Sequence, residues 1–134
     1  MKNFKKIVYV AGEYGGKEKN KKLMEDSCKL LSLNYPNYLF INGISQFCYF
    51  NEDDYHTGLS KCLTLMLKSA NEVWMLPNYT NSKGSMVELF MAESKSIPVR
   101  FLSVRIEEDI LVSVDLQNFV RKAHSFRCGM DSTL

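Results

Sequence analysis

Short apolar runs alternate with longer segments of mixed polarity along the whole chain. The first run, Ile7-Val8-Tyr9-Val10-Ala11, is rich in β-branched residues and has no polar residue at alternate positions. Such a run is typical of a strand that is buried on both faces, as strands of parallel sheets are. Similar runs predict strands over residues 7–11, 38–41, 72–76 and 98–104, with a candidate fifth strand over 110–112.

Between these runs, apolar residues recur at spacings of three and four, which is the period of an amphipathic helix. The segment before the third strand shows this spacing with Leu59, Cys62, Leu63, Met66 and Leu67. Helices are predicted over residues 17 to about 33, from a cap at Asp53 or Asp54 to about 68, over 85–96, and over 115 to about 126, with loops over 44–51 and 78–83.

Strands that alternate with helices predict an α/β fold. We expect a Rossmann-like parallel sheet of four to five strands, with helices on both faces and right-handed crossovers. A chain of 134 residues suffices for one domain with a real core, and no linker, internal repeat or low-complexity segment divides it. We therefore expect a single domain over residues 1–134.

Composition narrows the class of protein. Apolar residues make up 46% of the chain and charged residues 24%, which is the balance of a soluble globular domain. No apolar run is long enough to span a bilayer, and the first residues lead directly into a strand rather than into the apolar core of a signal peptide. These features predict a cytoplasmic protein with no membrane partner.

The cysteines and the charges predict little special chemistry. Four cysteines are scattered without a CxxC pair or a histidine at ligand spacing, so we expect buried thiols and no metal site. The formal charge is +2, and a solvated helix face explains the clustered lysines better than an anion-attracting rim. Without a nucleic-acid motif, no nucleic-acid polymer is expected as a partner. The clustered residues are Lys2, Lys5, Lys6, Lys17, Lys19, Lys21 and Lys22.

Two loops have the composition of a ligand site. In open parallel sheets, ligands bind beyond the carboxyl ends of the strands. The loop after the first strand, residues 12–16, contains Gly12, Tyr14 and Gly16, and its glycines let the backbone approach a ligand closely. The loop after the third strand is Ser82-Lys83-Gly84-Ser85, whose backbone N–H groups and hydroxyls can gather around an anion such as a phosphate.

Glu88 follows the second loop by one helical turn and has two interpretations. Ser85-Met86-Val87-Glu88 matches the capping box, in which the glutamate accepts a backbone hydrogen bond at the helix start. Spacing alone favours that interpretation. The alternative is a carboxylate that acts on a ligand about one sugar's width from the phosphate.

The order and spacing of several segments over residues 7–102 resemble the nucleoside 2-deoxyribosyltransferase superfamily. The similarity is greatest to its short phage and bacterial branch of unknown function, and the chain is also similar to nucleoside monophosphate N-glycosidases. The segments that carry this resemblance are residues 8–16, 62–63, 70–74 and 82–89, together with Ala92 and residues 97–99.

The resemblance implies an N-glycosidase or a deoxyribosyltransferase that needs no cofactor. Glu88 takes the place of the nucleophile that attacks the anomeric carbon of a nucleoside or nucleoside 5′-monophosphate, and Tyr9 takes the place of the tyrosine that orients it. Ser82, six residues before Glu88, and the loop with Gly12 and Gly16 match the phosphate-binding positions. The resemblance also implies a homo-oligomer, a dimer or larger.

The chain departs from the superfamily where a supporting aspartate is expected. Leu63-Thr64-Leu65 contains no acid, and Asp53 and Asp54 are alternatives that helix capping explains at least as well. His56 fits a solvent-facing position better than that of a catalytic acid or base. A catalytically weak or inactive nucleotide-binding protein, which senses or sequesters a nucleotide-derived signal, is therefore the alternative function, and a structural protein is a third.

Two aromatic residues near the third strand could stack on a base. Trp74 lies within the strand and is expected in the core, whereas Tyr79 lies in the polar loop between Asn78 and Thr80. Tyr79 is thus the better candidate for ligand contact.

Overall fold

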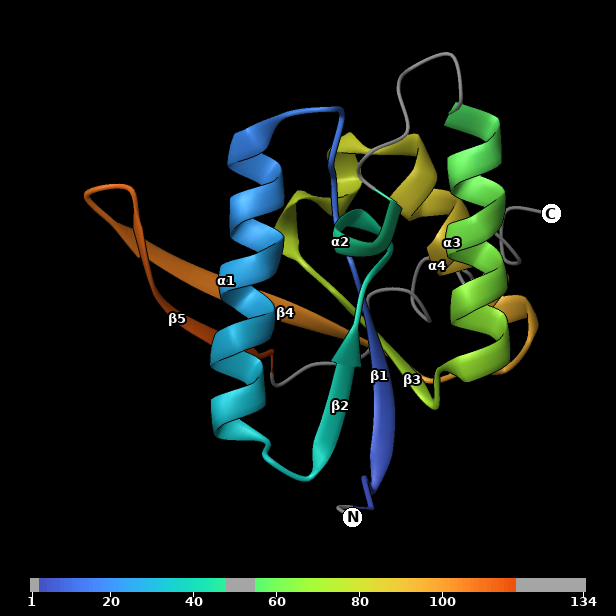
Figure 1. Cartoon of the computed structure of the whole chain (residues 1–134), viewed down its shortest axis with the longest axis horizontal. Helices are drawn as coiled ribbons and strands as arrows, with labels where there is room; N and C mark the ends of the chain where they lie inside the picture. The colour runs from blue at the N-terminus through green and yellow to red at the C-terminus, as the bar shows by residue number, and fades with distance from the viewer. Residues whose placement is uncertain (1–2, 48–54, 118–134) are drawn as a thin grey trace, which may run out of the picture.

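Five strands form one curled sheet in the computed structural model, which describes residues 3–47 and 55–117 (Figure 1). The strand order is β2-β1-β3-β4-β5. Strands β1 to β4 pair in parallel, as predicted, and β5 pairs antiparallel to β4. The strands are β1 (Lys6–Ala11), β2 (Tyr38–Ile41), β3 (Glu72–Met75), β4 (Val99–Glu107) and β5 (Ile110–Leu116).

The helices that connect the strands are α1, α3 and α4, with two shorter elements between them. No described helix is long and apolar enough to cross a membrane. The elements are α1 (Glu18–Asn34), α2 (Gly43–Phe47), α3 (Tyr55–Ser69), the 3₁₀ helix η2 (Pro77–Asn81) and α4 (Lys83–Ser94). The predicted caps at Asp53 and Asp54 lie outside the described residues.

Two hydrophobic cores lie on opposite faces of the sheet, so the prediction of helices on both faces is confirmed. Along β1, Val8 and Val10 face one core with Met24 and Leu31 of α1. The intervening Tyr9 faces the other core with residues of α3 and α4. This alternation explains the unbroken apolar run, because each face of the strand is covered by helices.

The prediction of loops over residues 44–51 and 78–83 was wrong in part. The side-chain oxygen of Asn42 accepts a hydrogen bond from the backbone N–H of Ser45 at 2.7 Å and thereby supports the start of α2. Pro77 stands at the start of η2, where its fixed φ favours a helical turn and its missing N–H costs no hydrogen bond. Both elements are too short to show a clear hydrophobic period.

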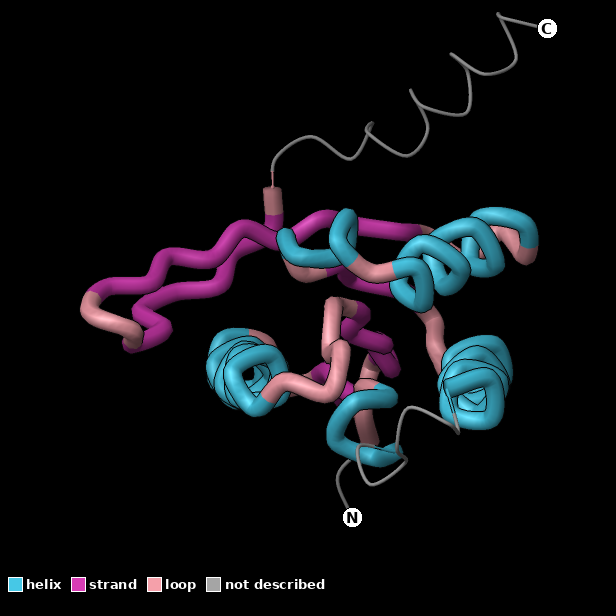
Figure 2. Tube along the Cα trace, turned by 90° about the horizontal axis from the view of Figure 1, so that it is seen from above, coloured by secondary structure: helices cyan, strands magenta, loops and turns pink. Residues whose placement is uncertain are grey.

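The prediction of a last helix from residue 115 was wrong at the start of that helix. Asp115 and Leu116 belong to β5, whose Val114 is buried against the α1 core. Val112, Val114 and Leu116 alternate with polar residues, which is a strand period. Residues 118–126 of that prediction lie outside the described residues. Figures 1 and 2 show the β4–β5 hairpin extending past α1.

Glu72 holds three strands together at the amino-terminal edge of the sheet. Its carboxylate forms an ion pair with Lys6 of β1 and accepts hydrogen bonds from Arg100 Nε of β4 at 3.0 Å and from Trp74 Nε1 at 2.9 Å. Burial alone would raise the pKa of Glu72, but the hydrogen bonds from Lys6 and Trp74, with the nearby positive charges, outweigh it and lower the pKa. Trp74 is buried in the α1 core, as predicted.

Glu72→Gln should lower the free energy of unfolding at neutral pH by about 1–2 kcal/mol, because hydrogen bonds to a charged partner are lost. A carboxyl whose pKa is lowered by folding stabilises the protein above its unfolded pKa and loses that contribution as the pH falls through its folded pKa. Urea unfolding at a series of acidic pH values should therefore show the variant and the wild type converging. Glu107→Gln, at an exposed position of β4, is the control, and a constant difference at every pH would contradict the assignment.

Candidate functional site

The loops after β1 and β3 meet where the strand order reverses. From β1 the chain crosses to β2 on one side, and from β3 it continues to β4 on the other. In open α/β sheets, ligands generally bind at such a switch point, beyond the carboxyl ends of the strands. The backbone N–H of Leu76 donates to Ala11 O at 2.8 Å, and the N–H of Glu13 donates to Asn78 Oδ1 at 3.0 Å. The loop after β1 is therefore joined to the segment that directly follows β3, whereas residues 83–85 of the second predicted site loop belong to α4.

Gly12 is required by the close approach of these loops. A Cβ atom at Gly12 would lie 2.9 Å from Asn78 Oδ1 and 3.1 Å from Leu76 Cδ1. Gly15 and Gly16 serve a different purpose, since both have positive φ (58° and 71°) and open space around them. They make the turn that leads into α1.

The structure brings Glu88 of α4 into contact with Tyr9 of β1. The Tyr9 hydroxyl donates a hydrogen bond to Glu88 Oε2, although 79 positions separate the two residues. Tyr9 is 1% exposed and Glu88 6%. Burial raises the pKa of Glu88 to about 7, against the opposing effect of the Tyr9 hydrogen bond. Glu88 thus has a desolvated carboxyl group whose charge is sensitive to pH near neutrality.

The capping-box interpretation of Glu88 was wrong. Ser82, not Ser85, caps α4, and its Oγ accepts the backbone N–H of Ser85 at 3.1 Å. Helix α4 starts at Lys83, two residues before the prediction, because η2 ends at Asn81 and leaves Ser82 extended in the cap position. Glu88 consequently lies in the second turn of α4, and its carboxylate is bonded to Tyr9.

Ser85 carries a buried hydroxyl with no described hydrogen-bond partner. The residue is 1% exposed, and its Oγ finds no donor or acceptor among the described residues. It lies in the first turn of α4, three residues before Glu88, with the half-buried Gly84 beside it. An unpaired buried hydroxyl is costly, so Ser85 is a candidate ligand contact.

Cys62 and Gly43 belong to the same cluster and were missed as site residues. Burial, followed by the charge of Glu88, raises the pKa of the Cys62 thiol to about 11, and a hydrogen bond with Tyr9 opposes this rise. A Cβ atom at Gly43 would lie 2.2 Å from Cys62 Sγ and 2.7 Å from the Tyr9 hydroxyl oxygen. The only sequence signal was the position of Asn42-Gly43 at the carboxyl end of the second strand.

The other two predicted aromatic contacts pack against different cores, Tyr79 against the core that contains Tyr9 and Tyr14 against the core on the opposite face. The Tyr79 ring in η2 packs against Phe101, with 5.5 Å between ring centroids. Tyr14 packs against the core on the α1 face, and its backbone oxygen accepts a hydrogen bond from Asn20 Nδ2 at 3.0 Å. Ligand contact by either tyrosine stays a prediction.

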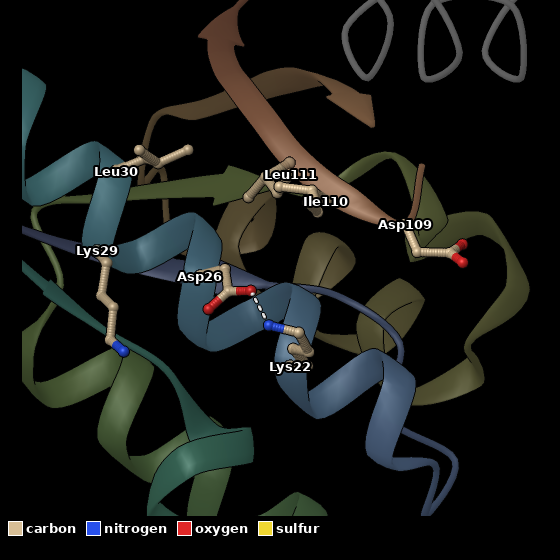
Figure 3. A pocket seen from close by; sticks show the side chains of 7 residues that line it. All are labelled: Lys22, Asp26, Lys29, Leu30, Asp109, Ile110 and Leu111. Carbon is tan, nitrogen blue, oxygen red and sulfur yellow. Dashed lines mark hydrogen bonds and ion pairs between the residues drawn. The ribbon is translucent and has the colours of Figure 1, made fainter. Parts of the chain in front are cut away.

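A pocket of about 240 Å³ lies away from this site, between α1 and the tip of the β4–β5 hairpin (Figure 3). Its lining includes Lys22 and Asp26, which form an ion pair at 2.7 Å. None of the predicted site residues lines it. Among residues 3–47 and 55–117, no cluster of His, Cys, Asp and Glu side chains is suited to hold a metal ion.

Comparison with protein families finds one match that covers most of the sheet. The model of a family described as a domain of unknown function, DUF4406, matches residues 6–101. This range includes Tyr9, Gly12, Cys62, Ser82 and Glu88. No curated protein matches the chain.

Proposed function

The chain belongs to the DUF4406 family, and we propose that it cleaves or transfers the glycosidic bond of a nucleoside or nucleoside 5′-monophosphate. The activity is that of an N-glycosidase or a 2-deoxyribosyltransferase, with Glu88 as the nucleophile and Tyr9 as the residue that orients it. The proposal starts from the resemblance to the nucleoside 2-deoxyribosyltransferase superfamily and applies it to the residues of the site.

One observation carries the proposal: the hydrogen bond from Tyr9 to the buried carboxylate of Glu88, beside the switch point of the sheet. A glutamate in the second turn of a helix does not cap the helix. Burying its carboxyl group costs free energy unless the group has a hydrogen-bond partner. A fixed, poorly solvated carboxylate is what nucleophilic attack on a sugar carbon requires.

The proposed reaction proceeds in two steps. An oxygen of the Glu88 carboxylate forms a bond to the anomeric carbon, the bond from that carbon to the base nitrogen breaks, and the base leaves with the electron pair and takes up a proton. In the second step, water or another base forms a bond to the same carbon and loses a proton to solvent, while the bond from that carbon to the Glu88 oxygen breaks and the carboxylate is restored. Water as acceptor makes the protein a hydrolase, and a second base makes it a transferase.

The first turn of α4 is suited to hold a phosphate of the substrate. The backbone N–H of Ser85 is bonded to Ser82 Oγ, but the N–H groups before it have no carbonyl partner within the helix, and the helix dipole favours an anion there. The unpaired hydroxyl of Ser85 adds a donor, and the exposed Lys83 adds a positive charge. Since Ser85 precedes Glu88 by about one turn, a phosphate at Ser85 and a sugar at Glu88 fit one nucleotide.

The binding-only alternative is favoured by the raised pKa of Glu88. At neutral pH a carboxyl with a pKa of about 7 is protonated in about half of the molecules, which weakens it as a nucleophile. Among the described residues, Tyr9 bonds to Glu88 and Cys62 interacts with its charge, and neither is a carboxylic acid that could protonate a leaving base. On this view the protein binds a nucleotide-derived signal without efficient turnover.

A ligand panel with the Ser85→Ala variant tests both functions. Thermal unfolding should show a nucleoside monophosphate stabilising the wild type by about 2.7 kcal/mol at 100 times its dissociation constant. Ser85→Ala should unfold at the same or a higher temperature without ligand, because it removes an unpaired hydroxyl, and should show a smaller ligand shift. Ser94→Ala, on the exposed end of α4, is the control.

Chromatography of the same mixtures separates the two functions. Release of a free base identifies the enzyme, and stabilisation without base release identifies the binding protein. Neither stabilisation nor release across nucleosides, mononucleotides, cyclic nucleotides and ADP-ribose would reject both.

A further inference from the structure

A side chain continues the hydrogen-bond ladder between β1 and β3 beyond the end of both strands. Ala11 pairs with Met75, and the backbone N–H of Leu76 donates to Ala11 O at 2.8 Å. Since alternate residues of a strand bond the same neighbour, the next ladder bond would run from the Glu13 N–H to the Leu76 carbonyl. That carbonyl instead accepts the N–H of Tyr79 at 3.0 Å, a bond that closes the first turn of η2.

Asn78 supplies the acceptor that the ladder lacks at this point. Its Oδ1 accepts the Glu13 N–H at 3.0 Å. This approach depends on the absence of a side chain at Gly12, because a Cβ there would lie 2.9 Å from Asn78 Oδ1. A backbone N–H can only donate, so the oxygen of the Asn78 carboxamide must face it. Within residues 3–47 and 55–117, Asn78 Nδ2 has no hydrogen-bond partner that would turn the group away.

The other end of the loop after β1 is fixed to α1. The Tyr14 carbonyl accepts hydrogen bonds from Asn20 Nδ2 at 3.0 Å and from the Lys17 N–H at 3.0 Å. The Asn78 bond fixes the start of the loop to η2, which in turn leads to Ser82, the cap of α4. The loop is therefore held to α1 at one end and to the segment before α4 at the other.

We propose that Asn78 is a positioning residue of the candidate site, whose carboxamide oxygen holds the loop after β1 in place relative to the start of α4. The two segments predicted to contact a ligand, residues 12–16 and 82–85, are thereby ordered before the ligand binds. A preorganised site loses less free energy in ordering its loops on binding. The inference rests on the proposed function only in treating these two segments as those that contact the ligand.

The loop contact is tested by hydrogen exchange of the Glu13 amide in the isotope-labelled full chain. Asn78→Ala removes the acceptor and should accelerate exchange at Glu13 about five-fold, the factor expected for one net hydrogen bond. Asn78→Asp keeps an oxygen acceptor and should exchange no faster than the wild type. Asn81→Ala, at an exposed asparagine of the same 3₁₀ helix, is the matched control and should also leave the rate unchanged.

Gly12→Ala reaches the same bond from the opposite side and serves where Asn78→Ala fails to fold. The added methyl group displaces Asn78 Oδ1, its nearest neighbour at 2.9 Å, so exchange at Glu13 should again accelerate. An unchanged rate at Glu13 in the variant that folds would overturn the positioning role. Equal acceleration in Asn78→Asp or in Asn81→Ala would overturn it too.

Ligand measurements connect the position of the loop with the site. In thermal unfolding with each common 2′-deoxynucleoside 5′-monophosphate, Asn78→Ala should bind at least about ten-fold more weakly than the wild type. With activity present, KM should rise by a similar factor while kcat changes by less than about three-fold, because the Tyr9–Glu88 bond does not involve Asn78.

The two proposals fail in different ways. Accelerated exchange at Glu13 with unchanged affinity for a monophosphate that the wild type binds would overturn the positioning role and leave the proposed function standing. Accelerated exchange at Glu13 in Asn78→Ala but not in Asn78→Asp, in a protein that binds no nucleoside or nucleotide, would support the loop contact and reject the proposed function.

Discussion

Replacing Glu88 with Gln should lower kcat by at least about 1,000-fold on any nucleoside or nucleotide that the wild type cleaves, because removal of a nucleophile has effects of this size or larger. The Gln side chain keeps nearly the same shape and retains an oxygen that can accept the Tyr9 hydrogen bond. Since Glu88 does not cap its helix, no capping bond is lost either. The measurement is the rate of base release, monitored by chromatography.

Glu93→Gln is the control for this substitution. Glu93 lies on the same helix and is only half buried. Its substitution makes the same chemical change, because one carboxylate oxygen is replaced by an NH2 group. It should retain wild-type turnover. If Glu88→Gln cleaves the substrate as fast as Glu93→Gln does, Glu88 is not the nucleophile.

The pH dependence of the wild type follows from the same assignment. Only the ionised carboxylate can attack, so kcat/KM should rise as the pH increases through the Glu88 pKa of about 7. Activity that falls as the pH increases through this range would contradict attack by Glu88.

Gly43→Ala should destabilise the fold by about 1–3 kcal/mol, because the added methyl group overpacks a buried cluster. Its Cβ would lie 2.2 Å from Cys62 Sγ, a distance that requires Cys62 or Tyr9 to move. Movement of Tyr9 would also disturb the Tyr9–Glu88 hydrogen bond, so activity or ligand binding should fall further than stability alone explains. The measurement is the midpoint of urea unfolding, with the m value checked for a change in the unfolded state.

Gly58→Ala is the matched control. Gly58 lies within α3, and nothing approaches the position of its Cβ within 4 Å. Alanine is favoured over glycine in a helix by about 1 kcal/mol, so this variant should be as stable as the wild type or more stable. Equal destabilisation by the two substitutions would show that the close packing of Cys62 and Tyr9 around Gly43 does not contribute to stability.

The four parallel strands could be predicted because the signal is local. The run Ile7–Ala11 is apolar without interruption, and only a strand covered on both faces accepts that pattern. Helix α1 was predicted to within a residue at each end for a similar reason, since its apolar spacing extends over several turns. The short elements α2 and η2 give no such periodic signal, and β5 was recognised only over its first three residues.

The place of the candidate site is a prediction from the sequence. The order of strands and helices puts the loops after β1 and β3 at one edge of the sheet, and Gly12 and Ser82 stand in those loops. The contacts that each of these residues makes could not be predicted from the sequence. Ser82 caps α4 while Ser85 is left unpaired, the reverse of the roles that local spacing favoured.

By itself, the sequence determined the class of fold and the parallel strands, because these depend on residue patterns within single elements, and it predicted the edge of the sheet at which we propose that a ligand binds. Only the tertiary structure decided that Glu88 bonds Tyr9, and that Cys62 and Gly43 join them. Those contacts connect residues from four elements, and a buried carboxylate selects its partner by distance and desolvation rather than by spacing along the chain.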